Sequence, residues 1–128
     1  MRLFRVIFAT YYFMRAIRAY DRRDFGKALT LYDRALAWEP PMPWGEAFFA
    51  TLLVLSDRSD EARGVFEGLI EELSPIEDPT ENERYVLNYC RHFDGLLNGT
   101  EAESFRVQAL AASPERHVRM CLRLERRQ

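Results

Sequence analysis

The chain has 128 residues and a formal net charge of −2 at pH 7, with 48% apolar and 30% charged residues. This length and this balance predict one folded globular domain with a core of its own, and they exclude a disordered chain. The near-neutral net charge gives no support to a nucleic-acid partner.

The first predicted helix covers residues 3–22 and begins with an unusually apolar stretch. Ten of the twelve residues at 3–14 are apolar, and five of those are aromatic. From Thr10 onward the apolar side chains keep to one side of the helix, but those of residues 3–8 surround it. Arg5 interrupts the run, no small-residue cleavage site follows, and a transmembrane helix needs about 20 apolar residues. We therefore expect neither a signal peptide nor a membrane span.

The second predicted helix lies within residues 24–40, where Asp24 can cap its start and Pro40 prevents its continuation. Its buried face is predicted by five residues at helical spacing, namely Ala28, Leu31, Tyr32, Ala35 and Leu36. The pattern returns 34 residues later, in residues 59–75. Ala62 corresponds to Ala28, Phe66 to Tyr32 and Leu69 to Ala35.

A third occurrence of the pattern is predicted in residues 100–114. It is marked by Ala102, Ala109 and Pro114. Thr100 and Glu103 form a capping box at its start. Helices are also predicted at 44–55 and 82–97, one before each of the later occurrences, and a last helix at 115–128. Helix pairs that repeat with a period of about 34 residues predict an α-solenoid.

On these residues the chain resembles the tetratricopeptide repeat (TPR) family. The resemblance rests on small residues where helices approach, an aromatic residue between them and a terminating proline: Ala28, Tyr32, Ala35, Pro40, Ala62, Phe66, Ala102, Ala109 and Pro114. It spans roughly residues 9–114 and departs from the family at Arg15, Leu69 and Arg106. It implies an all-α solenoid of about three antiparallel helix pairs, at 9–42, 43–76 and 83–116, with a C-terminal capping helix at 115–128.

The resemblance also implies a concave groove, lined by the first helix of each pair, that binds a peptide or protein partner. The implied groove residues are Phe13, Ile17, Tyr20, Trp44, Thr51, Arg84, Asn88 and Arg91. Arg84 and Arg91 share a helix face, so we expect them to hold an acidic segment. The alternative is that the aromatic residues are buried by the protein's own helices. Phe13 and Ile17 occupy places where some family members grip a terminal carboxylate, so that mode is not expected.

Candidate catalytic and metal-binding groups are few. The chain has two histidines, one lysine, no glycine-rich phosphate loop and no serine in a nucleophile-elbow context, so we expect no enzymatic activity and no cofactor. A zinc site would need both cysteines and both histidines, that is Cys90, His92, His117 and Cys121. Cys90 and His92 are two residues apart and point to different sides of a helix, so no metal is expected. Two cysteines make no disulfide framework, which favours a cytoplasmic location.

The charges are unevenly distributed along the chain. Residues 1–34 carry eight basic and three acidic side chains, residues 35–80 two and ten, and residues 81–128 eight and seven. This pattern could steer partners or pair with another copy, although solvated helix faces produce it too. The acidic residues at 71–83 are interpreted as a solvated linker. The C-terminal arginines lack interleaved aromatic residues, so no nucleic-acid partner is expected.

These observations predict a non-enzymatic interaction scaffold. Residues 3–11 lie before the repeat proper, and we expect them to form a homodimer interface through Leu3, Phe4, Ile7, Phe8 and Tyr11. One alternative is a membrane-surface adaptor that inserts this segment at the lipid interface. Another is burial of the segment within the chain itself. A small metal-binding or enzymatic helical protein is the remaining alternative.

Overall fold

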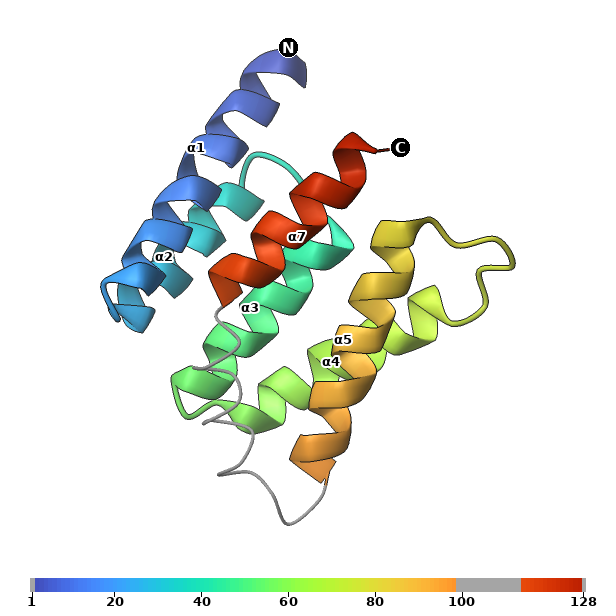
Figure 1. Ribbon diagram of the computed structural model, residues 1–128. Coiled ribbons are helices and arrows are strands. Elements are labelled where there is room, and N and C mark those ends of the chain that lie inside the picture. The colour runs from blue at the N-terminus through green and yellow to red at the C-terminus, as the bar shows by residue number, and fades with distance from the viewer. Residues whose placement is uncertain (1, 99–113, 128) are drawn as a thin grey trace. The chain divides into compact units, whose positions relative to one another are not determined.

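The computed structural model describes residues 2–98 and 114–127, and every regular element in those ranges is a helix. The six described helices are α1 (Arg2–Asp21), α2 (Phe25–Leu36), α3 (Pro43–Leu55), α4 (Ser59–Leu73), α5 (Glu81–Asn98) and α7 (Pro114–Arg126) (Figure 1). The predicted all-α class is confirmed for this part of the chain. The helix predicted at 100–114 lies outside the described residues apart from Pro114, where α7 begins.

The chain divides into two compact units, Met1–Met42 and Pro43–Gln128. The first unit holds α1 and α2, and the second holds α3, α4, α5 and α7. The single domain expected at residues 1–128 stays a prediction. Each unit is therefore described by itself.

In the first unit, α2 packs along α1 (Figure 1). Aromatic pairs join α1 to α2 and to the residues just after α2. The ring centroids lie 6.1 Å apart in the pair Phe13–Tyr32, 5.5 Å in Tyr20–Phe25 and 4.7 Å in Phe8–Trp38. Asp24 caps α2 as predicted, because its carboxylate accepts a hydrogen bond from the backbone N–H of Lys27 at 3.2 Å. Ala28 is fully buried and lets the two helices approach closely.

The turn between paired helices has the same form in α1–α2 and in α3–α4. Arg23 and Asp57 adopt positive φ angles of 61° and 62°. In each case the next N–H reaches back five residues, from Asp24 to Ala19 O at 3.0 Å and from Arg58 to Leu53 O at 2.8 Å. This is a Schellman motif that ends the first helix of each pair, formed here without glycine. The two helix–turn–helix pairs therefore follow one local plan.

In the second unit, α3 is the central helix. Its sequence, PWGEAFFATLLVL, is apolar almost all round, and nine of its thirteen residues are buried. It packs against α4, α5 and α7, and α7 also packs against α5. The core contains fully buried side chains from every helix of this unit, among them Phe48, Leu52, Phe66, Val86 and Val118. The C-terminal helix is therefore part of the core of this unit.

Candidate functional site

Trp44 and Thr51, which the sequence analysis expects in a groove, make contacts within the second unit itself. Thr51 is fully buried, and its hydroxyl lies 2.7 Å from the hydroxyl of Tyr89. Trp44 is half-buried, and its Nε1 donates to Glu125 of α7 at 2.6 Å. Because α7 packs on both α3 and α5, it occupies the surface from which Thr51 would meet a peptide. Thr51 is a core residue and offers no contact to an external partner.

The groove residues expected on α5 lie on a different face of that helix. Arg84, Asn88 and Arg91 are all exposed, and Arg91 donates to the hydroxyl of Ser74 at 3.3 Å. The face of α5 toward α7 instead carries aromatic residues, since Tyr89 stacks on His117 with ring centroids 4.0 Å apart. The three polar side chains are therefore accessible, but the structure does not bring them together with Trp44 or Thr51 in one open groove.

The groove residues expected on α1 are mostly core residues. Ile17 and Tyr20 are buried, and Phe13 is half-buried against Tyr32. The hydroxyl of Tyr20 accepts a hydrogen bond from Arg23 Nη1 at 3.1 Å. The structure shows that the protein's own helices bury Ile17 and Tyr20. This is the alternative that the sequence analysis left open.

His117, Cys90 and Cys121 are buried in the second unit. Burial lowers the pKa of His117 to about 4, against a weaker opposing effect of its hydrogen bond with the carbonyl of Trp44 at 3.2 Å. Burial likewise raises the pKa of Cys90 and of Cys121 to about 12, so both stay protonated. Among the described residues, no cluster of three or more His, Cys, Asp or Glu side chains is arranged to hold a metal ion.

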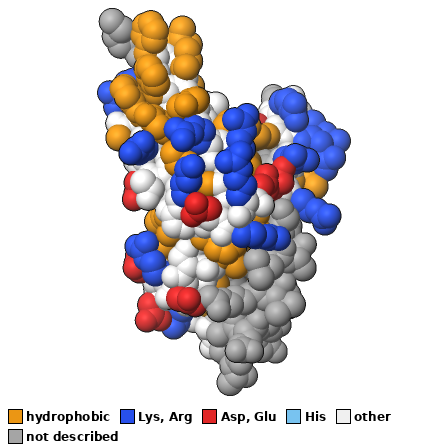
Figure 2. Space-filling model, turned by 90° about the vertical axis from the view of Figure 1, so that its left-hand side faces the viewer, with side chains coloured by type: hydrophobic (Ala, Val, Ile, Leu, Met, Phe, Trp, Pro, Cys, Tyr) orange, Lys and Arg blue, Asp and Glu red, His pale blue; other side chains and the backbone are white. Residues whose placement is uncertain are grey.

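The main unpartnered surface of the described residues lies along the first half of α1. Six large apolar side chains, each 41–71% exposed, follow one another at helical spacing: Leu3, Phe4, Ile7, Phe8, Tyr11 and Met14. We call this set the apolar stripe. Figure 2 shows hydrophobic side chains gathered at this end of α1, at the top of the view. Five of the six were predicted from sequence as an association surface, and Met14 was not.

Contacts with the end of α2 hold this half of α1 in place. The ring of Phe8 stacks on Trp38, and Arg5 Nε donates to the carbonyl of Trp38 at 2.9 Å. One side of this segment is therefore covered by the first unit itself. The other members of the apolar stripe remain open, together with Val6 on the adjoining flank, and Phe8 stays 42% exposed beside Trp38.

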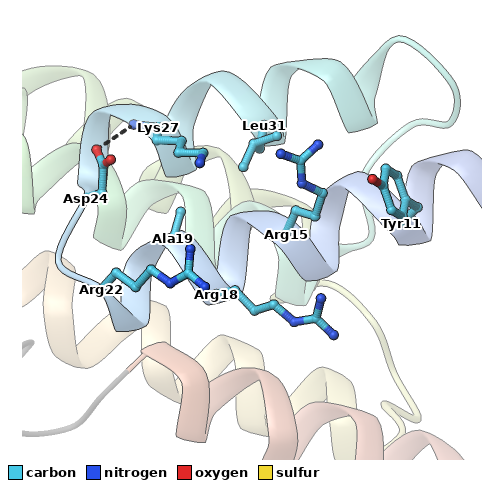
Figure 3. Close-up of a pocket in the computed structure, with 8 residues that line it drawn as sticks. All are labelled: Tyr11, Arg15, Arg18, Ala19, Arg22, Asp24, Lys27 and Leu31. Carbon is cyan, nitrogen blue, oxygen red and sulfur yellow. Dashed lines mark hydrogen bonds between the residues drawn. The ribbon is translucent and has the colours of Figure 1, made fainter.

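The same side of α1 becomes cationic in its second half. Arg15, Arg18 and Arg22 continue the line of the apolar stripe at spacings of three and four residues, and Lys27 approaches from α2 (Figure 3). Together they surround a hollow of about 370 Å³ within the first unit. We call these four side chains the cationic hollow. Sequence reasoning interpreted its arginines as an ordinary solvated face, although their shared spacing with the apolar stripe was a usable signal.

The cationic hollow carries little neutralising charge. Asp24 is the one carboxylate that lines it, and that carboxylate also caps α2. None of the four cations forms an ion pair with a described carboxylate. Arg15 instead places its guanidinium 5.6 Å from the centre of the Tyr11 ring, at the junction with the apolar stripe. The first unit therefore presents a continuous surface that is apolar at one end and positively charged at the other.

Comparison with known proteins finds no family profile, no curated protein and no solved structure that matches the chain. Within the described part of the chain, no helix is both long enough and apolar enough to cross a membrane. The surface of the first unit is therefore interpreted from its own chemistry.

Proposed function

We propose that the chain is a non-enzymatic, TPR-like interaction scaffold that associates with a second copy of itself through the apolar stripe. The observation that supports this is the exposure of six large apolar side chains in one line on α1. Exposed apolar patches of this size are typical of protein interfaces. Large aromatic side chains supply much of the binding energy at such interfaces, and the stripe contains Phe4, Phe8 and Tyr11.

The area of the apolar stripe is adequate for a small interface. An aromatic side chain offers about 150–250 Å², so three that are roughly half exposed supply about 300 Å². The three aliphatic members bring the total to roughly 500 Å² or more, against about 800 Å² for each partner in a standard interface. The stripe is therefore the centre of the proposed interface, and neighbouring residues must complete it.

Charge decides the direction in which two stripes would pair. A parallel arrangement would set the arginines of both cationic hollows side by side, and like charges at close range repel. An antiparallel arrangement overlaps only residues 3–14, over about 17 Å of helix, and leaves the two hollows at opposite ends. Such a pair has two-fold symmetry, the commonest symmetry of oligomers. We therefore propose an antiparallel pair of α1 helices.

The exposed face of α5 is the second part of the proposed scaffold. Arg84, Asn88 and Arg91 remain accessible and could receive an acidic or carboxylate-bearing segment of a protein partner. An Arg84→Ala, Arg91→Ala double variant should then bind the natural partner more weakly. Equal affinity of wild type and double variant would remove this assignment.

Light scattering after size exclusion tests the self-association. The wild-type chain should be a dimer at tens of micromolar, and Phe4→Glu or Ile7→Glu should give a folded monomer. Met42→Glu is the matched control, because Met42 is also an exposed apolar residue of the first unit but lies outside the stripe. A wild-type monomer, or a dimer that tolerates both substitutions, contradicts the proposal. Unfolding of either variant in far-UV circular dichroism would instead indicate a core role.

One observation favours a second candidate function, that of a membrane-surface adaptor. The apolar stripe adjoins cationic residues on the same helix face, and such a combination suits an interface rich in anionic lipid. Flotation with vesicles of phosphatidylcholine and phosphatidylserine tests this. Recovery of wild type with the vesicles, and its loss in Phe4→Glu, would support the adaptor function over the dimer.

A further inference from the structure

Acidic residues in the last turn of α4 and in the connection after it have the opposite charge to the cationic hollow. Four carboxylates, which we call the acidic corner, are exposed and form no ion pair with a described basic residue: Glu71, Glu72, Glu77 and Asp78. They belong to the second unit, at the end of α4 and in the connection to α5. Their potential reaches neighbouring groups, since burial and then the charge of Glu72 raise the pKa of Glu46. The first unit therefore carries four cations, and the second unit four carboxylates, that form no ion pair with a described residue of the same unit.

We infer that the acidic corner of one copy docks against the cationic hollow of a second copy. This inference rests on the self-association proposed above and adds a second, polar contact to it. The two surfaces match in number of charges and carry opposite signs, and Arg forms strong two-pronged hydrogen bonds with carboxylates. In a symmetric pair the contact occurs twice, once at each end.

The connection between the units limits how far the second unit of a chain can lie from the start of its own α1. α2 ends at Leu36, and Trp38, just beyond it, contacts Arg5 and Phe8 near the start of α1. In an antiparallel pair, the start of one α1 lies beside Tyr11 and Met14 of the other, next to the hollow. Residues 37–42 then span at most about 20 Å before the second unit begins. The short connection at residues 37–42 therefore allows the second unit of the partner to reach the cationic hollow when the two apolar stripes are paired.

The arrangement of cations fits several separate carboxylates better than one compact anion. Arg15, Arg18 and Arg22 extend over seven residues of helix, or about 10 Å. A single phosphate would meet only part of that row. A long polyanion such as a nucleic acid would meet the whole row, but the second unit of the chain, with its excess of acidic residues, would repel it. A short run of carboxylates avoids both difficulties.

Reversal of charge on each surface gives a direct test. The hollow variant carries Arg18→Glu and Arg22→Glu, and the corner variant carries Glu77→Arg and Asp78→Arg. All four residues are exposed, so both variants should remain folded. Sedimentation equilibrium at about 50 mM salt, where charges act over more than about 10 Å, should show each dimer weakened at least about tenfold. Arg126→Glu with Arg127→Glu is the matched control on exposed cations at the end of α7, and it should leave the wild-type dissociation constant unchanged.

Mixing the two variants identifies the contact as one between chains. In the mixture the intact corner of the hollow variant meets the intact hollow of the corner variant, and the two reversed surfaces also match. An equimolar mixture should therefore recover the wild-type dissociation constant. If the mixture stays weak while a chain with all four substitutions recovers, the contact lies within one chain and the inference is wrong.

The other outcomes separate this inference from the proposed function. Reversal variants that dimerise as tightly as wild type overturn the docking contact, and the apolar interface stands if Phe4→Glu still abolishes the dimer. A wild-type chain that is monomeric at tens of micromolar overturns both. Binding of a short oligothymidylate to wild type and not to the hollow variant, with an unchanged dimer, would assign the hollow to nucleic acid and overturn the inference.

Discussion

His117 makes the stability of the second unit depend on pH. Its ring is almost completely buried in α7, between Tyr85 and Tyr89, with ring-centroid distances of 5.4 Å and 4.0 Å. Burial lowers its pKa from 6.5 to about 4. A protonated imidazole would be a charge in this apolar site, so the fold holds the ring neutral. The proposed test replaces His117 by Phe, which keeps a ring between the two tyrosines and cannot be protonated.

The direction and size of the effect follow from proton binding. Between about pH 6.5 and pH 4 the unfolded chain protonates His117 and the folded chain does not, so the free energy of unfolding falls as the pH falls through this window. Below about pH 4 both states are protonated and no further loss occurs. Each pH unit inside the window is worth about 1.4 kcal/mol, so the loss between about pH 7.5 and pH 5 is about 2 kcal/mol.

Urea unfolding at the two pH values, followed by far-UV circular dichroism, measures this loss. The wild-type chain should lose about 2 kcal/mol more than His117→Phe on going from about pH 7.5 to pH 5. Glu46 and Asp94, whose pKa values are raised mainly by burial, act in the opposite direction, but they are present in both proteins and cancel in the comparison. His92→Phe is the control at an exposed histidine. Equal pH dependence in wild type and His117→Phe would refute the reasoning.

Four further substitutions test the packing of α3, α4 and α5. Gly64→Ala and Gly68→Ala should each raise the free energy of unfolding by about 0.5–1 kcal/mol in urea titrations, because an added methyl group meets no atom within 4 Å and Ala favours a helix interior. Thr51→Val should lower it by about 1–2 kcal/mol in the same assay, since the hydroxyl of Tyr89 loses its partner. Phe66→Ala should lower it by about 3–5 kcal/mol, because this fully buried ring packs against the core.

Local helix signals were enough to predict much of the secondary structure. The helices predicted at 44–55 and 82–97 agree with α3 and α5 to within one residue at each end. Asp24 caps α2 because a carboxylate at that position can satisfy an otherwise unpaired N–H. A second signal of the same kind was missed. Thr80 and Glu83 form a reciprocal capping box at the start of α5, with hydrogen bonds of 2.9 Å and 3.1 Å.

The position of α7 could not be predicted from its own periodicity. An amphipathic pattern shows which side of a helix is apolar, but it does not show which neighbour that side meets. The contacts that fix α7 are polar and distant in sequence, such as Asn82 Nδ2 to the carbonyl of Cys121 at 2.8 Å and Trp44 to Glu125. These contacts turn Thr51 from an expected groove residue into a core residue.

The apolar pattern of residues 3–8 does not show which side of the helix is covered. Apolar side chains on all sides of residues 3–8 indicate burial on all sides, yet the pattern cannot separate the side that Trp38 covers from the side that stays open. The structure separates them and shows that the open side runs on into Arg15, Arg18 and Arg22. A wholly apolar partner that covered both halves would bury those guanidinium groups without counter-charges, at a high cost in free energy. A partner that covers the whole of this face would therefore have to present an apolar surface to the first half of α1 and carboxylates to the second. The antiparallel second copy proposed above would provide that combination.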